Sequence, residues 1–194
     1  FCHCLLGAWH QMAVILSAAA CLRWLTTVSG AADEAALLAE VEAADRDPRL
    51  LFLPYLSGER TPHNDPDASG AFVGLTHATT RADLGRAVLE GVAFALADGQ
   101  EALRASGTLI DRLSVIGGGA RSRFWGRVLA TALERPLQYH AGAELGPAFG
   151  AARLARLAAG TEPVEAVCTA PPLAEVVEPV AAWMDGMRER RQRF

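Results

Sequence analysis

Lysine is missing from this sequence of 194 residues, and all 18 of its basic residues are arginine. The phosphate-binding loop of P-loop NTPases needs a lysine that reaches the outer phosphates. A site of that type is therefore excluded. Any phosphate group bound by this chain must be held by backbone N–H groups, hydroxyl groups, arginine side chains or a metal ion.

An excess of positive charge is missing as well, because the formal net charge is -4. Duplex nucleic acids are bound by a concentrated basic surface, so we expect no nucleic-acid partner. Long hydrophobic runs are also scarce: the apolar stretch 12–20 is too short to span a bilayer, and Arg23 interrupts its continuation. We expect no membrane partner and no signal peptide, and hence a cytoplasmic protein.

The few cysteines form no paired framework that would indicate disulfides. Cys2 and Cys4 flank His3, but alternating positions on a strand point to opposite faces, and no second Cys/His pair follows at zinc spacing. We therefore predict no metal site. Reduced thiols, as in cytoplasmic proteins, are expected for Cys2, Cys4, Cys21 and Cys168.

What the sequence does contain is an alternation of apolar segments with strand and helix periodicity. The patterns predict strands over residues 9–15, 50–53, 113–116 and 136–139. They predict helices over residues 18–27 (with Ser17 as N-cap), 33–44, 81–106, 121–133, 146–159, 164–168 and 179–191. Residues 54–70 are polar and proline-rich, which is typical of an ordered loop. The alternation of strands and helices after residue 108 indicates an α/β architecture.

Three consecutive glycines, Gly117 to Gly119, join the apolar run 113–116 to the amphipathic segment 121–133. A strand that turns through glycines into a helix brings backbone N–H groups close to a ligand, since no Cβ stands in the way. The geometry favours a phosphate group or the sugar of a nucleotide. The alternative is a tight turn without a ligand, and the triplet does not complete a G-x-G-x-x-G fingerprint.

Three stretches of the chain resemble the C-terminal domain of one enzyme family. The first begins with Gly-Ala-Phe-Val-Gly-Leu at 70–75 and continues with Asp-Leu at 83–84 and Ala-Val-Leu-Glu at 87–90. The second is Leu-Ser-Gly-Glu-Arg-Thr-Pro-His at 56–63, and the third is Gly-Gly-Gly-Ala-Arg-Ser-Arg-Phe-Trp at 117–125. Together they are similar to the signatures of the FGGY carbohydrate kinases, and the second resembles the xylulokinase group within that family.

The resemblance implies a C-terminal lobe with the actin-like ATPase (ribonuclease H-like) fold, in which a mixed sheet is flanked by helices. Kinases of this family have two lobes, and ATP and sugar bind in the cleft between them. Residues 1–194 correspond to a single C-terminal lobe. The sequence starts at Phe1 inside an apolar segment, so we expect this lobe to be truncated at its N-terminal edge and the N-terminal sugar-binding lobe to be absent.

The activity that the resemblance implies is the ATP-dependent phosphorylation of D-xylulose to D-xylulose 5-phosphate by the full-length enzyme, with ATP and Mg²⁺ as cofactors. No position matches the family's catalytic aspartate, so no catalytic residue is assigned and the fragment alone is expected to be inactive. Two alternatives are another kinase of the family, acting on ribulose, gluconate or glycerol, and a non-catalytic nucleotide-binding module. A homodimer is a further implication of the resemblance.

The resemblance also places seven residues at the nucleotide, in the glycine turn and on the first helix: Gly117, Gly118, Gly119, Ala120, Ser122, Ala19 and Arg23. Gly118 and Ser122 fall where the family contacts the nucleotide. Ser122 has a second interpretation, as the cap of the helix that follows. Related kinases often carry glutamine in place of Arg23, so the alternative there is a surface arginine without a ligand.

The loop residues Glu59, Arg60 and His63 are candidates for contact with the sugar, because functional residues are often found on loops. The alternative is a loop that folds around an ion pair of Arg60 with Glu59 or Asp65. Such a loop would shape the cleft without touching the substrate.

Three further polar residues are interpreted without a catalytic role. Glu90, on the long helix, is expected to be a partly buried, hydrogen-bonded structural carboxylate. His77 and His140 are expected to be surface or edge histidines. On the same long helix, Gly91 and Gly99 predict the close approach of a neighbouring backbone.

Overall fold

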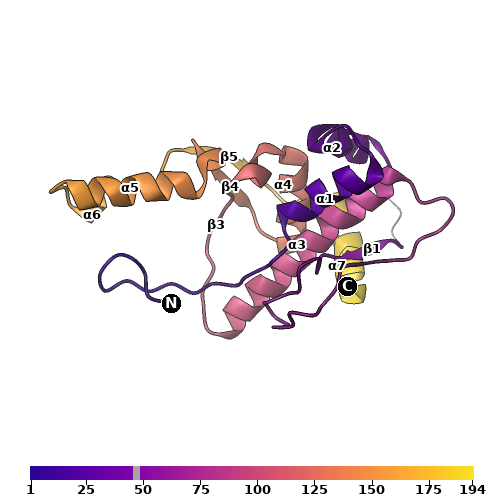
Figure 1. Cartoon of the computed structure of the whole chain (residues 1–194), viewed down its shortest axis with the longest axis horizontal. Coiled ribbons are helices and arrows are strands. Elements are labelled where there is room, and N and C mark those ends of the chain that lie inside the picture. Colours follow the sequence, from indigo (N-terminus) through magenta and orange to yellow (C-terminus); the bar gives the residue numbers. More distant parts are fainter. Residues whose placement is uncertain (46–48) are drawn as a thin grey trace.

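The computed structural model describes residues 1–45 and 49–194, and the long helix α3 (Arg81–Ala105) runs through its centre (Figure 1). A capping box starts this helix: the Thr80 hydroxyl accepts the Asp83 N–H, and the Asp83 carboxylate accepts the Thr80 N–H. The elements that pack on α3 include α1 (Ala19–Ser29), α2 (Glu34–Ala43), α4 (Arg123–Leu133) and strand β1 (Leu51–Leu53). Helix α3 is therefore the scaffold on which the other elements are placed.

Strand β1 crosses α3 at Gly91, where a Cβ atom would come within 2.1 Å of the Phe52 carbonyl oxygen. The predicted close approach of a backbone is confirmed at this glycine. At Gly99 the nearest neighbour of such a Cβ is the Cβ of Ala13, at 3.1 Å. The approach at Gly99 thus involves a side chain and not the backbone.

The described residues form two small sheets, one from strands that precede α3 in the sequence and one from strands that follow it. β1 pairs antiparallel with β2 (Ala71–Val73). Farther along the chain, β3 (Leu113–Ser114) runs parallel to β4 (Leu137–His140), and β5 (Leu173–Val177) runs antiparallel to β4. Helix α4 connects β3 to β4 and contacts both β5 and α3. The result is a mixed sheet covered by helices, so the predicted α/β class is confirmed.

The prediction of a strand over residues 9–15 is wrong. Trp9 forms only an isolated bridge with Cys2, and the following residues have no regular structure. Val14 instead exchanges hydrogen bonds with Thr61: its N–H donates to the Thr61 hydroxyl at 3.0 Å, and its carbonyl accepts the Thr61 N–H at 3.0 Å. The backbone of this segment therefore pairs with a loop at Val14, while the Ala13 and Ile15 side chains approach Gly99 of α3.

Strands β2 and β5 were not predicted, although all three residues of β2 and four of the five residues of β5 are apolar. β2 has three residues, none of them buried, and in β5 only Val177 is buried. Both are held by pairing with a partner strand that is distant in sequence. A pattern search along the chain detects burial and cannot detect such pairing.

Several helix boundaries differ from the predicted ones by one or two residues; the helix predicted over 121–133, for example, begins at Arg123, after a 3-10 turn over Gly118–Arg121. Ser17 is not the N-cap of α1, since Ala18 holds that position without a side-chain hydrogen bond; Ser17 is buried, and its carbonyl accepts the Cys21 thiol at 2.8 Å. The helix predicted over 179–191 is divided into a 3-10 turn, Ala181–Trp183, and α7 (Met184–Arg193). Residues 179–180 precede both pieces.

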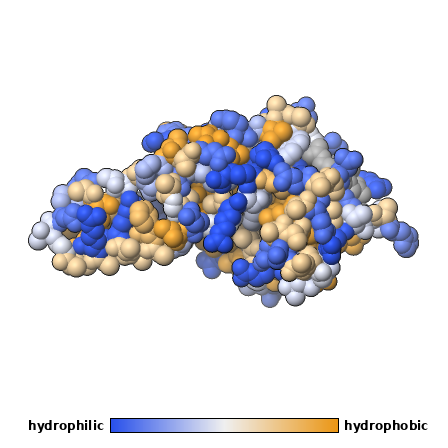
Figure 2. All heavy atoms as spheres, turned by 90° about the horizontal axis from the view of Figure 1, so that it is seen from above, coloured by the Kyte–Doolittle hydropathy of each residue, from blue (hydrophilic) through white to orange (hydrophobic). Residues whose placement is uncertain are grey.

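Helices α5 (Pro147–Ala159) and α6 (Val164–Val167) form an arm that reaches away from α3 (Figures 1 and 2). No residue of α5 is buried, and the space-filling view shows hydrophobic and hydrophilic residues mixed on the arm (Figure 2). Within the described residues, no helix combines the length and the hydropathy needed to cross a membrane.

Candidate functional site

A cleft of about 780 Å³ lies between α1, α2 and the start of α4. One wall, formed by α1 and α2, is mostly small and apolar: Ala19, Leu22, Ala35, Leu38 and Ala39. The opposite wall is formed by the glycine turn and the first turns of α4. The cleft therefore combines an apolar wall with exposed backbone, and its sides come from segments about 100 residues apart in the sequence.

The cleft brings together five of the seven residues predicted for the nucleotide: Ala19, Arg23, Gly118, Gly119 and Ser122. The other two do not line it. Ala120 is 5% exposed and belongs to the core. Gly117 adopts φ 84°, a left-handed conformation that favours glycine, and its N–H donates to the Ala143 carbonyl at 2.8 Å.

The glycine turn contributes backbone to the lining of the cleft at Gly118 and Gly119. Within the part of the chain that the structure describes, neither the Gly118 nor the Gly119 N–H donates to a protein acceptor. A Cβ atom at Gly118 would meet nothing within 4 Å, so the space in front of it is open. Exposed N–H groups without a partner are suited to bind anionic oxygens.

Ser122 forms the predicted cap of α4, since its hydroxyl oxygen accepts the Trp125 N–H at 3.1 Å. Ser122 also lines the cleft. Accepting this bond leaves the hydroxyl proton available to donate. The capping role is thus confirmed, and contact with a nucleotide stays a prediction.

Most charges at the cleft are already paired. Arg23 lies 3.2 Å from Glu34, which links α1 to α2, and the Arg23 side chain is 82% exposed. Arg127 lies 2.5 Å from Glu42. These exposed pairs contribute little to stability, but they neutralise the carboxylates on the α2 side of the cleft.

Arg121 is a cleft residue that the sequence interpretation missed. It is exposed, lines the cleft and forms no ion pair with any described residue. Its neighbour Arg123 is engaged elsewhere: it pairs with Glu175 and lies 4.1 Å above the Tyr139 ring. One sequence signal points to Arg121: it is the first cationic residue after the three glycines.

The loop over residues 54–70 lies outside the cleft lining. Glu59 is 1% exposed, and its Oε1 accepts the N–H groups of Leu16 at 3.0 Å and of Arg60 at 2.8 Å. The ion pair of Arg60 with Glu59 or Asp65, considered above, is not formed among the described residues. Glu59 therefore anchors the loop through backbone hydrogen bonds. Direct sugar contact by Glu59, Arg60 or His63 stays a prediction.

Two groups beside this loop have raised pKa values. Burial, with a smaller effect of the Glu59 carboxylate, raises the pKa of the Cys21 thiol to about 12. Burial and the charges of Asp98 and Glu59 raise the pKa of Tyr55 to about 12. Both groups stay protonated at neutral pH, and the Tyr55 hydroxyl bonds to His63 Nε2 at 3.0 Å.

The family profile described as "FGGY family of carbohydrate kinases, C-terminal domain" matches residues 3–159. The chain belongs to that family. The xylulose kinase of Escherichia coli (strain K12) is 50% identical over 163 residues, which cover 84% of this FGGY chain and 34% of the relative. The chain thus spans about a third of the length of the curated relatives it matches.

Two solved structures resemble this FGGY chain closely. The xyloylose kinase from Brucella ovis has a TM-score of 0.88 at 45% identity, over 100% of this chain and 41% of that one. The xylulose kinase from Rhodospirillum rubrum has a TM-score of 0.76 at 31% identity, over 94% of this chain and 38% of that one. The predicted family and the C-terminal lobe fold are confirmed.

The polar residues interpreted as non-catalytic lie away from the cleft. Glu90 is 4% exposed and accepts hydrogen bonds from two arginines, Arg86 and Arg190. His77 is exposed. His140 is half-buried on β4 and contacts the Ser114 hydroxyl at 3.2 Å. The structural interpretation of Glu90 is confirmed.

Proposed function

We propose that this chain is the nucleotide-binding lobe of a xylulose kinase, which transfers the γ-phosphoryl group of ATP to D-xylulose and yields D-xylulose 5-phosphate. One observation carries the proposal: Gly118 and Gly119, whose N–H groups have no acceptor among the described residues, line an open cleft. Phosphoryl transfer depends on positioning and charge stabilisation, which such donors supply. The names of the similar proteins favour xylulose as the acceptor.

Each wall of the cleft has a part in this proposal. The Gly118 and Gly119 amides and the Ser122 hydroxyl donate to the phosphates or the ribose. Arg121, the cation without an ion pair among the described residues, faces their negative charge. The apolar surface of α1 and α2, including Ala19 and Leu38, takes the base.

Mg²⁺ fits this arrangement only as part of the nucleotide complex. The carboxylates that line the cleft are engaged: Glu34 and Glu42 pair with arginines, and Asp33 accepts the Ala36 N–H at 2.7 Å. We therefore assign no metal ligand to this chain, and the phosphate oxygens hold the ion. The ion supplies charge neutralisation to the phosphates.

The proposal requires a second part of the protein. The sugar-binding lobe and the catalytic base are assigned to the portion that the longer relatives have beyond the matched third of their length. We propose that residues 1–194 form one lobe, inactive by itself, of an enzyme that acts in the cytoplasm and assembles as a homodimer.

The test is a substrate panel on the protein expressed from its complete coding region. ADP release should depend on D-xylulose and Mg²⁺, and ribulose, gluconate and glycerol should be at least about tenfold poorer by kcat/KM, as expected when polar sugar groups are left unpaired. A preference for one of those acceptors would instead identify another FGGY kinase. ATP binding without any acceptor-dependent turnover would identify a non-catalytic nucleotide-binding module.

A further inference from the structure

Arg86 of α3 lies beneath the cleft and faces two aromatic rings. Its guanidinium carbon is 5.3 Å from the centre of the Phe124 ring and 4.7 Å from that of Trp183. Its Nε donates to Glu90 at 2.7 Å, and the Arg86 side chain is 11% exposed. A guanidinium held over aromatic faces with little access to water makes its strongest cation–π contacts.

Phe124 connects Arg86 to the cleft. It belongs to the first turn of α4, is 5% exposed, and lines the cleft. Ser122, two residues earlier, caps the same turn. Phe124 therefore links the buried Arg86 to the first turn of α4, which follows the glycine turn directly.

The ion pair with Glu90 does not by itself explain how the buried charge of Arg86 is stabilised. Glu90 already has a bidentate partner in Arg190, whose Nε and Nη2 donate to it at 2.6 and 2.9 Å. One carboxylate and two guanidinium groups leave the buried cluster with a surplus positive charge. In the described structure, Arg86 Nη2 is buried without a hydrogen-bond partner. The surplus charge is thus stabilised mainly by the rings of Phe124 and Trp183.

We propose that Arg86 is a positioning residue for nucleotide binding: by fixing the Phe124 ring it holds the first turn of α4, and hence the glycine turn, in the orientation that receives the phosphates. The inference rests on the proposed function of the cleft. Arg86 itself touches neither nucleotide nor sugar, so its removal should weaken the interaction with ATP and leave the interaction with the sugar intact.

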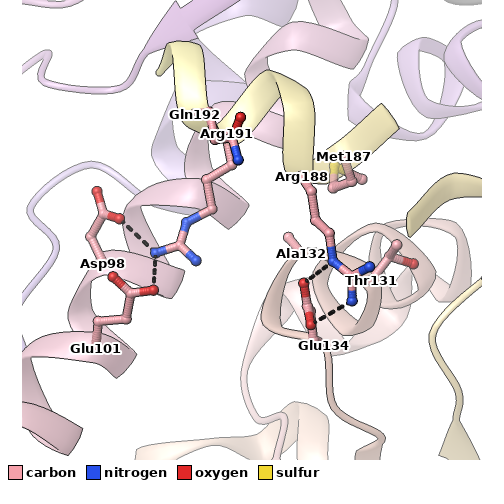
Figure 3. A pocket seen from close by; sticks show the side chains of 9 residues that line it. All are labelled: Asp98, Glu101, Thr131, Ala132, Glu134, Met187, Arg188, Arg191 and Gln192. Atoms are coloured by element: carbon pink, nitrogen blue, oxygen red, sulfur yellow. Dashed lines mark hydrogen bonds and ion pairs between the residues drawn. The ribbon is translucent and has the colours of Figure 1, made fainter. Parts of the chain in front are cut away.

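The other arginines of α7 provide a control. A second, smaller pocket lies where α7 meets α3 and α4 (Figure 3). There Arg191 binds Asp98 at 3.0 Å and Glu101 at 2.8 Å, and Arg188 binds Glu134 at 2.7 Å (Figure 3). These ion pairs also attach α7 to the scaffold, but none of them involves a residue that lines the nucleotide cleft.

The experiment compares Arg86→Gln with Arg191→Gln in the protein from the complete coding region. Arg86→Gln should raise the KM for ATP about tenfold, as loss of a desolvated cation–π contact predicts, with the KM for D-xylulose within about twofold of wild type. Arg191→Gln should lower the melting temperature without raising the KM for ATP. Arg86→Lys, which keeps a cation over the rings, should recover most of the lost ATP interaction.

A second variant, Trp183→Leu, removes one of the two rings without touching the cleft, and should also raise the KM for ATP if Arg86→Gln does not fold. An unchanged KM for ATP in folded Arg86→Gln, or an equal rise in Arg191→Gln, would overturn the inference. Wild-type protein that uses no ATP at all would instead refute the proposed function, so the two failures are distinguishable.

Discussion

Glu90 and Arg190 are 100 residues apart in the sequence and form a bidentate ion pair that is nearly inaccessible to water, with side chains 5% and 3% exposed. The pair fastens α7 to the middle of α3. Because each group has lost its hydration, the pair is stabilising only while both partners are present. This relationship leads to the first prediction.

Replacing Arg190 by methionine should destabilise the fold strongly. Glu90 would then keep only the single hydrogen bond from Arg86, and we expect the free energy of unfolding to fall by about 3 kcal/mol. Urea denaturation followed by far-ultraviolet circular dichroism measures this change. Arg156→Gln, which removes the exposed Arg156–Glu162 pair on the arm, is the control and should leave the urea midpoint unchanged. A loss below about 1 kcal/mol in Arg190→Met would contradict the structural role.

Substitution of Gly118 should reduce ATP affinity, whereas substitution of Gly117 should reduce stability. Gly118 has open space in front of it and no positive φ, so Gly118→Val should fold normally. The added side chain would cover the amides of the turn and reduce ATP affinity at least about tenfold. Gly117→Ala should instead cost about 1 kcal/mol of stability, because Gly117 has φ 84°. Titration with a fluorescent ATP analogue and urea denaturation separate the two effects.

A normal ATP affinity in Gly118→Val would show that the turn does not bind the nucleotide. The tight-turn interpretation of the three glycines would then be sufficient. This variant therefore tests the observation on which the proposed function depends.

Arg121 supplies a third prediction. Arg121→Gln should raise the KM for ATP about tenfold, since a charged hydrogen bond to phosphate is lost. The difference from wild type should shrink as ionic strength rises, because salt screens exposed charges. Arg104→Gln is the matched control, since Arg104 is also exposed but does not line the cleft. Equal effects of the two substitutions would indicate a general response to net charge.

Helices α1, α2 and α4 could be predicted because their apolar residues recur at helical spacing and are buried against α3. The helix predicted over 81–106 is observed as Arg81–Ala105, with its capping box intact. The strand predicted over 9–15 is wrong for a physical reason: Val14 forms its backbone hydrogen bonds with Thr61 of the loop over 54–70, and the Ala13 side chain approaches Gly99 of α3. Backbone pairing cannot be predicted from one segment alone.

Residues of the candidate site could be predicted from the sequence only where they belong to a recognisable motif. The glycine turn and Ser122 stand out in the sequence, and the structure places both at the cleft. Arg121 and the apolar wall of α2 did not stand out, because arginine and alanine are common throughout the chain. These residues form part of a cleft only because the fold brings α2 close to the start of α4. Local sequence patterns do not show which segments come together in the fold.

Cysteine reactivity provides a test of the fold near the loop. Burial raises the pKa of Cys21 to about 12, so its thiol is protonated and inert at pH 8, whereas Cys2, Cys4 and Cys168 are exposed. Iodoacetamide should modify the three exposed thiols of the native protein and leave Cys21 unmodified. Mass spectrometry counts the adducts, and the urea-unfolded chain should accept one more. Rapid modification of Cys21 in the native state would contradict the packing of α1 against Pro54.

Glu59 offers the sharpest test of whether the loop over 54–70 binds sugar or only shapes the protein. Its Oε1 accepts two backbone N–H groups in a buried position, while Oε2 has no partner among the described residues. Glu59→Ala removes both acceptors and should lower the free energy of unfolding by about 2 kcal/mol, because two buried donors lose their partner.

Glu59→Gln keeps one acceptor oxygen for those donors, so it should retain most of the stability that Glu59→Ala loses. If Glu59 only anchors the loop, the KM for D-xylulose in Glu59→Gln should stay within about twofold of wild type. A large rise in that KM, with stability and the KM for ATP unchanged, would show that the carboxylate also contacts the sugar. His63→Gln gives the comparison on the same loop, since His63 is exposed and bonded only to Tyr55 among the described residues.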